Sequence, residues 1–197
     1  MNIGKPILAA VMSLATLAPC KAQKSVQYIA ETGFTGVVNN GHVLYSGMNF
    51  GFPRGKNYTN LYAGMNLNSD KQVSFVGLAL NNYNWTKNIS SWVREAFSLS
   101  KRGANSTLEV APIRANTQAG KFDISFAPAY VVRNDFKAGT ATQGINTIFQ
   151  TTYSITPSDK IYFEAAYTST PAKNIFKTHF DKFADNISYM ISYMKSL

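Results

Sequence analysis

The chain has 197 residues, yet it contains one cysteine and only two histidines. A single cysteine cannot close an intramolecular disulfide, so hydrogen bonds and packing have to hold the fold together. Cysteine, histidine and carboxylate residues do not cluster at the spacings of a zinc site, and no aspartate-rich loop of the calcium type occurs. The sequence therefore predicts no metal and no cofactor.

Long apolar runs are also scarce, and the one at the N-terminus is too short to span a bilayer as a helix. Lys5 precedes the apolar stretch Ile7 to Ala18, and Ala22 provides a small residue before a cleavage point. This pattern predicts a signal peptide over residues 1–22, which would direct the protein out of the cytoplasm. Lipidation of Cys20 stays open as an alternative, because the residues before it partly match the lipobox of bacterial lipoproteins.

Acidic residues are few: 10 of them stand against 19 lysines and arginines, which gives a formal net charge of +9. Such a surplus suits phosphates of lipopolysaccharide, anionic polysaccharides or acidic solutes. The basic residues are scattered over predicted turns, with no basic helix and no interleaving with aromatics. The sequence accordingly predicts no nucleic-acid partner.

What the sequence does contain is repeated alternation of apolar and polar residues, bounded by turn residues. In one segment, Phe122, Ile124 and Phe126 alternate with Asp123 and Ser125. A period of two is typical of a strand whose two faces meet different surroundings. Counted along the chain, such segments predict about eight to ten antiparallel strands in one domain over residues 23–197.

The last eleven residues, Ile187 to Leu197, alternate most regularly. Tyr189, Ile191 and Tyr193 lie on one face of this segment, and serines lie on the other. With the export signal, this segment resembles the closing strand of small bacterial outer-membrane β-barrel proteins, whose assembly signal is a C-terminal strand that ends in an apolar residue. The resemblance implies an all-β fold, an antiparallel up-and-down β-barrel of about 8–10 strands in the outer membrane of a Gram-negative bacterium. It also implies outer-membrane lipid, lipopolysaccharide and the barrel assembly machinery as partners.

The apolar faces of the predicted strands are rich in aromatic and branched residues, as expected of a surface that contacts lipid. The opposite faces are rich in small polar residues, which suit a crowded lumen. The expected lipid-facing residues are Phe122, Ile124, Phe126, Phe149, Tyr153, Ile161, Phe163, Tyr189, Ile191 and Tyr193. In the alternative, a soluble periplasmic or secreted barrel, the same aromatics would line an apolar ligand cavity.

Charged residues on the predicted strands are candidates for the barrel interior. These candidates are Arg94, Glu109, Arg114, Asp123, Arg133 and Glu164. In a barrel of eight to ten strands, opposite charges in the lumen commonly pair and fill it, which predicts a structural ion network. The other interpretation is a narrow pore that selects small polar or anionic solutes by charge.

One segment, Thr170 to Asp185, breaks the alternation and shows helical spacing instead. Thr170 and the proline after it would start a short amphipathic loop helix. Its candidate interaction residues are Lys173, Phe176, Lys177, Phe180 and Phe183. Such a helix would pack on the barrel rim, or act as a lid, plug or surface element that contacts lipopolysaccharide or a partner.

Support for catalysis is weak. His42 and His179 are the available imidazole bases, and only His42 has a nearby nucleophile, Ser46, with no acid to complete the group. We therefore predict an integral outer-membrane barrel with a structural, adhesive or narrow-pore role and no enzymatic activity. An outer-membrane lipid-modifying enzyme is kept as a further alternative.

Overall fold

The computed structural model describes residues 26–37, 42–68, 72–101, 103–169 and 187–197. The chain forms strands β1 (Gln27–Val37), β2 (His42–Arg54), β3 (Asn57–Asn68), β4 (Val73–Asn84), β5 (Ile89–Ser100), β6 (Gly103–Ala119), β7 (Phe122–Asp135), β8 (Thr140–Ser154), β9 (Asp159–Ser169) and β10 (Ile187–Ser196). No helix of the described residues is long and apolar enough to cross a membrane. The signal peptide predicted for residues 1–22 and the loop helix predicted for residues 170–185 lie outside the described residues.

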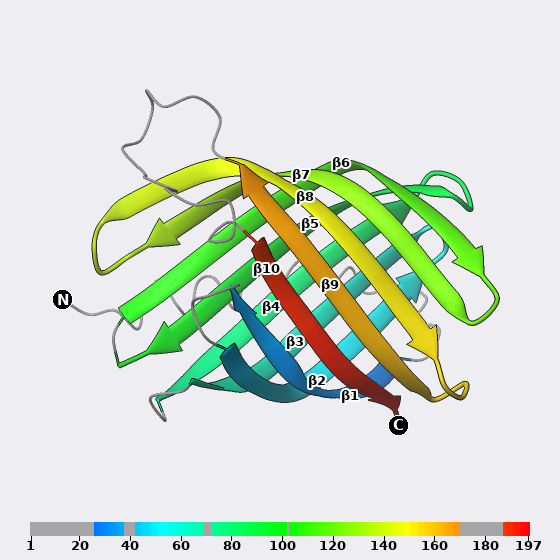
Figure 1. Ribbon diagram of the computed structural model, residues 1–197, viewed down its shortest axis with the longest axis horizontal. Coiled ribbons are helices and arrows are strands. Elements are labelled where there is room, and N and C mark those ends of the chain that lie inside the picture. Colours follow the sequence, from blue (N-terminus) through cyan, green and yellow to red (C-terminus); the bar gives the residue numbers. More distant parts are fainter. Residues whose placement is uncertain (1–25, 38–41, 69–71, 102, 170–186) are drawn as a thin grey trace.

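Each strand pairs antiparallel with the next one along the chain, and β1 pairs with β10, so the sheet closes on itself as a barrel. Figure 1 shows the tilted strands, with the first and last lying side by side. The Leu197 amide donates to the Tyr28 carbonyl oxygen at 2.9 Å, which extends this closing seam to the last residue. The predicted antiparallel up-and-down barrel is confirmed, with ten strands that include the first pair.

The register assigns the large apolar side chains to the outside of the barrel. Phe34 pairs with both Leu44 and Ile191, and these three side chains are 55%, 43% and 45% exposed. Directly opposite residues in an antiparallel pair share a face, so this assignment propagates from strand to strand. It places all ten residues expected to face lipid on the outer face.

Glu95 is an exception on the outer face. It pairs with Leu108 and Ala79 near the middle of β5, between the outward side chains Val93 and Phe97. Its side chain is exposed and has no ion pair within the described residues. A carboxylate at this place costs free energy if lipid surrounds the barrel, although less than an arginine or lysine would.

A β-bulge in β6 changes which residues of that strand face inward. Trp92 of β5 pairs with Ala111, whereas Ser90 pairs with Arg114, so β6 carries one extra residue at this point. Pro112 lies within the bulge, where a missing N–H is tolerated because the ladder is already interrupted. The bulge therefore allows Arg114 to face the lumen on the same strand as Glu109, although their spacing is an odd number of residues.

Glycines on the inner faces of β1, β2 and β3 let neighbouring strands approach closely. A Cβ on Gly33 would collide with the Ile191 carbonyl oxygen, and one on Gly64 would lie 2.6 Å from the Ser46 carbonyl oxygen. Gly47, which pairs with Gly64, would meet the Ala63 carbonyl oxygen in the same way. Backbone atoms cannot move aside as a flexible side chain can, so this part of the sheet requires glycine.

We expect Gly33→Ala to reduce the yield of folded barrel strongly, because β1 and β10 could no longer pair at their present distance. Gly77→Ala is the matched control, since the nearest atom to its Cβ would be the Tyr62 carbonyl oxygen at 3.9 Å. The readout is the fraction of protein that refolds in detergent to the form with heat-dependent gel mobility. Equal yields for the two variants would contradict the close approach of β1 and β10.

Candidate functional site

The barrel interior is crossed at mid-height by an ion network centred on Arg94. Its guanidinium donates two hydrogen bonds to the Glu164 carboxylate, at 2.9 and 3.1 Å, and pairs with Glu109 as well. The side chains of Arg94, Glu109 and Glu164 are 15%, 6% and 10% exposed. Because Glu109 belongs to β6 and Glu164 to β9, Arg94 of β5 joins strands that are not neighbours. We call these three residues the lumen triad.

Uncharged side chains complete the hydrogen bonding of the lumen triad. Tyr162 and Gln150 donate to Glu164, at 2.6 and 2.7 Å, and Asn146 donates to Glu109. The Thr168 hydroxyl in turn donates to the Asn146 side-chain oxygen at 2.7 Å. A buried ion pair is tolerated when its remaining acceptors are satisfied in this way.

An apolar layer lies directly against the lumen triad. It is formed by Trp92, Ala111, Ala127, Ala129, Ile148 and Ala166, with Leu80 packed against it. The Trp92 ring lies under the Arg94 guanidinium, 5.1 Å from ring centroid to Cζ, a cation–π arrangement. Ile148 and Ala111 are completely buried. Triad and apolar layer together fill this part of the lumen with side chains.

A second polar cluster lies on the inner faces of β1, β2 and β3. The Glu31 carboxylate accepts hydrogen bonds from the Tyr45 hydroxyl, at 2.9 Å, and from the Asn49 amide. Asn60 then donates to the Asn49 side-chain oxygen at 2.9 Å. Tyr45 and Asn49 are 5% and 4% exposed, so this cluster fills the lumen on the side away from the lumen triad.

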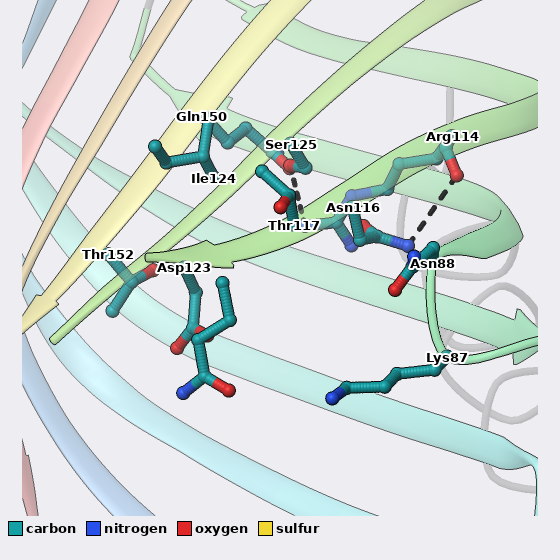
Figure 2. Close-up of a pocket in the computed structure, with 11 residues that line it drawn as sticks. Lys87, Asn88, Arg114, Asn116, Thr117, Asp123, Ile124, Ser125, Gln150 and Thr152 are labelled. Atoms are coloured by element: carbon teal, nitrogen blue, oxygen red, sulfur yellow. Dashed lines mark hydrogen bonds between the residues drawn. The ribbon is translucent and has the colours of Figure 1, made fainter. Parts of the chain in front are cut away.

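At the barrel end where the last strand finishes lies a cavity of about 240 Å³, which we call the cup. Side chains from β6, β7, β8 and the β4–β5 turn surround it (Figure 2). Among its lining residues are Lys87, Arg114, Asn116, Asp123, Gln150 and Thr152.

The floor of the cup is connected to the lumen triad by hydrogen bonds. The Arg114 guanidinium donates to the Ser125 hydroxyl at 2.8 Å, and that hydroxyl donates to the Gln150 side-chain oxygen at 3.1 Å. Gln150 is also a donor to Glu164 of the triad. Any change in the position of Arg114 is therefore coupled to the residues that fill the lumen.

The six charged residues predicted for the lumen fall into three places. Arg94, Glu109 and Glu164 meet in the triad, and Arg114 and Asp123 line the cup. Arg133 is on the inner face near the opposite end of β7 and is exposed. The loop-helix candidates Lys173, Phe176, Lys177, Phe180 and Phe183 lie outside the described residues.

Sequence reasoning missed Glu31, as well as the neutral donors Tyr162, Gln150 and Asn146. The sequence could have indicated that Glu31 faces the lumen, because this acidic residue lies between Ala30 and Thr32, which face outward. The sequence gives no such indication for the neutral donors, because glutamine, asparagine and tyrosine occur on both faces of the strands.

The candidate base His42 lies on the outer face of β2, and its side chain reaches across β1 to a residue of β10. Its Nδ1 is 2.9 Å from the Tyr189 hydroxyl, and no hydrogen bond joins it to a serine or a carboxylate within the described residues. His179 lies outside the described residues. No group of three or more potential metal ligands occurs in the part of the chain that the structure describes.

Comparison with known proteins gave structural matches alone. No family model matches the chain, and no curated protein matches it. The chain is similar to the KdgM porin in complex with disordered oligogalacturonate, at 11% identity and a TM-score of 0.46, over 87% of this chain and 98% of that one. It is similar to the NanC porin at 12% identity and a TM-score of 0.46, over 86% and 100% of the two chains. Neisserial surface protein A matches at 11% identity and a TM-score of 0.35, over 87% and 94%.

Proposed function

We propose that the chain is an integral β-barrel of the bacterial outer membrane whose lumen is closed at mid-height, so that it serves the envelope as a structural barrel. The observation that carries the closed lumen is the burial of the lumen triad together with the apolar layer beside it. An open aqueous pore would leave such inward side chains exposed to water. With this role, outer-membrane lipid and lipopolysaccharide would surround the barrel, and the barrel assembly machinery would insert it.

The outer face supports the membrane location. Large apolar side chains cover it from β1 round to β10, and those of Phe75 and Ile113 are 61% exposed. Soluble monomers rarely expose an apolar surface that encircles the molecule. The same orientation weighs against a soluble barrel with an apolar ligand in its lumen, because the aromatics expected to line that cavity point outward.

The two barrel ends suggest the orientation in the membrane. Both the C-terminus and the short β8–β9 turn lie at the end that holds the cup, since the Ser196 amide donates to the Ser158 carbonyl oxygen at 2.8 Å. The longest connection, residues 170–186, joins β9 to β10 at the other end. Bacterial barrels of this kind have short periplasmic turns and longer extracellular loops. The cup would thus open to the periplasm, and an adhesive role would depend on the opposite end.

A narrow pore for small polar or anionic solutes is the second candidate. The observation that favours it is that, among the residues that the structure describes, side chains and not a strand or a helix fill the lumen. Arg94 forms an ion pair with each of the two carboxylates of the triad. A rearrangement of this one side chain would remove the ion pairs that join β5 to β6 and β9.

Conductance across a planar lipid bilayer tests the closed lumen. We expect the wild-type barrel to show no sustained conductance steps, and the variant Arg94→Ala with Glu164→Ala to conduct, because two large side chains leave the lumen. Arg133→Ala is the matched control, since Arg133 lies outside the triad and is exposed. Sustained wild-type steps that the double substitution does not change would contradict the closed lumen and favour a permanent pore.

A further inference from the structure

Two cationic side chains line the cup, and neither forms an ion pair within the described residues. Within the described residues, the Arg114 side chain donates a hydrogen bond to the neutral Ser125, and its Nε atom is buried without a hydrogen-bond partner. Lys87 has no ion pair within the described residues. By contrast, two carboxylates and a ring satisfy the guanidinium of Arg94. A buried donor without an acceptor is costly, so the protein itself satisfies Arg114 less completely than Arg94.

Most of the other residues that line the cup are polar, and they carry little opposing charge. Asp123 is the acid among its lining residues, so the lining has a net positive charge when Lys87 and Arg114 are counted. Asn116, Gln118 and Thr152 supply hydroxyl and amide groups that both donate and accept hydrogen bonds. In Figure 2, the Lys87 side chain extends from its turn toward the side of the cup where Asp123 lies. Cations and mixed polar groups around one cavity match a small solute that carries an anionic group on a hydroxylated body.

We propose that the cup binds a small solute that carries a phosphate or carboxylate group on a polar, hydroxyl-rich body. The anionic group is bound by Arg114 and Lys87, and the body contacts Asn116, Gln118 and Asp123. A cavity of about 240 Å³ accommodates a molecule of monosaccharide size. This binding requires the folded barrel but does not depend on whether the lumen is closed.

Isothermal titration of the refolded barrel in neutral detergent at low ionic strength tests the site. The probes are inorganic phosphate and D-glucuronate, with D-glucose as the neutral counterpart. We expect saturable binding of at least one anion and none of glucose, because charge-assisted hydrogen bonds supply most of the free energy. Added salt should weaken the binding.

Four variants locate the binding within the barrel. Lys87→Gln and Arg114→Gln should each weaken anion binding at least about tenfold, and Asp123→Asn should strengthen it by removing a repulsive charge. Lys56→Gln is the matched control, because Lys56 is exposed in the β2–β3 turn at the same barrel end but does not line the cup. It should bind like the wild type.

The heat-dependent mobility shift of each variant verifies folding. If Arg114→Gln does not fold, Lys87→Gln still tests the site, since Lys87 is exposed in a turn. Absence of saturable binding for both anions, or equal binding by Lys87→Gln, Lys56→Gln and the wild type, would overturn the proposal. If the barrel binds an anion in the cup and also shows sustained conductance, the proposed binding site is supported and only the closed lumen is refuted.

Discussion

Replacing Ile191 with arginine is expected to prevent stable insertion of the barrel into a bilayer. Ile191 lies midway along β10 on the outer face, between Tyr189 and Tyr193, and is 45% exposed. An arginine at the bilayer midplane of a transmembrane barrel costs about 2–4 kcal/mol, a large share of the stability of a small domain. The measurement is the fraction of protein that folds into phospholipid vesicles, read from the heat-dependent mobility shift.

Two further substitutions distinguish this effect from general damage. Ile155→Arg introduces the same charge in the β8–β9 turn and should insert normally, because that turn lies at the barrel rim. Glu95→Leu removes the carboxylate from the outer face and should raise the folded fraction above that of the wild type. Normal insertion of Ile191→Arg, or a loss of folding in Glu95→Leu, would show that lipid does not surround this face.

Replacing Arg94 with alanine is expected to destabilise the folded barrel by about 3–5 kcal/mol, because it leaves the buried carboxylates of Glu109 and Glu164 without a counter-charge. The measurement is urea-induced unfolding of the barrel in vesicles. Tryptophan fluorescence is a suitable probe, since Trp92 is 3% exposed and lies next to Arg94. Arg133→Ala, the exposed control, should change the free energy of unfolding by less than about 0.5 kcal/mol.

A compensated variant separates the cost of lost pairing from that of lost packing. Arg94→Met combined with Glu109→Gln and Glu164→Gln removes all three charges while keeping most of the side-chain volume. Neutral replacement of a complete buried ion network is often tolerated, so this variant should regain most of the stability lost in Arg94→Ala. If Arg94→Ala unfolds at the same urea concentration as the wild type, the triad does not contribute to the fold as the geometry indicates.

Strand positions and faces were open to prediction because they depend on a local pattern. A strand that separates lipid from a lumen has to alternate at every second residue, and the alternation of Phe122, Ile124 and Phe126 follows directly from that requirement. The same pattern predicts about eight to ten strands, and a closed barrel leaves none of them with an unpaired edge. For these features, the type of each residue indicates which face of its strand the residue occupies.

Contacts across the lumen could not be predicted in the same way. Which charge meets Arg94 depends on strand tilt and on the stagger between β5, β6 and β9, and neither quantity is encoded in alternation. The bulge at Pro112 adds a second difficulty. In a regular strand, Glu109 and Arg114 would face opposite sides, so only a residue that breaks the period places both in the lumen. A proline within a predicted strand was the signal available for that break.

Two sequence predictions concern residues outside the described ranges and stay predictions. The signal peptide over residues 1–22 predicts a mature protein that begins near Gln23 when it is isolated from the envelope. The loop helix over residues 170–185 predicts an amphipathic element at the barrel end opposite the cup. Neither is required for closure of the barrel, which the pairing of β1 with β10 provides.

Fractionation of the native host tests the proposed membrane role most directly. Envelope membranes would be separated into inner and outer fractions and washed with alkaline carbonate, and the gel mobility of the protein would be compared before and after boiling. We predict that the protein stays in the outer-membrane fraction and migrates differently once it is boiled, as a stable barrel does. Release by carbonate as a soluble protein would contradict the lipid-facing role of the outer surface and require another partner to cover its apolar side chains.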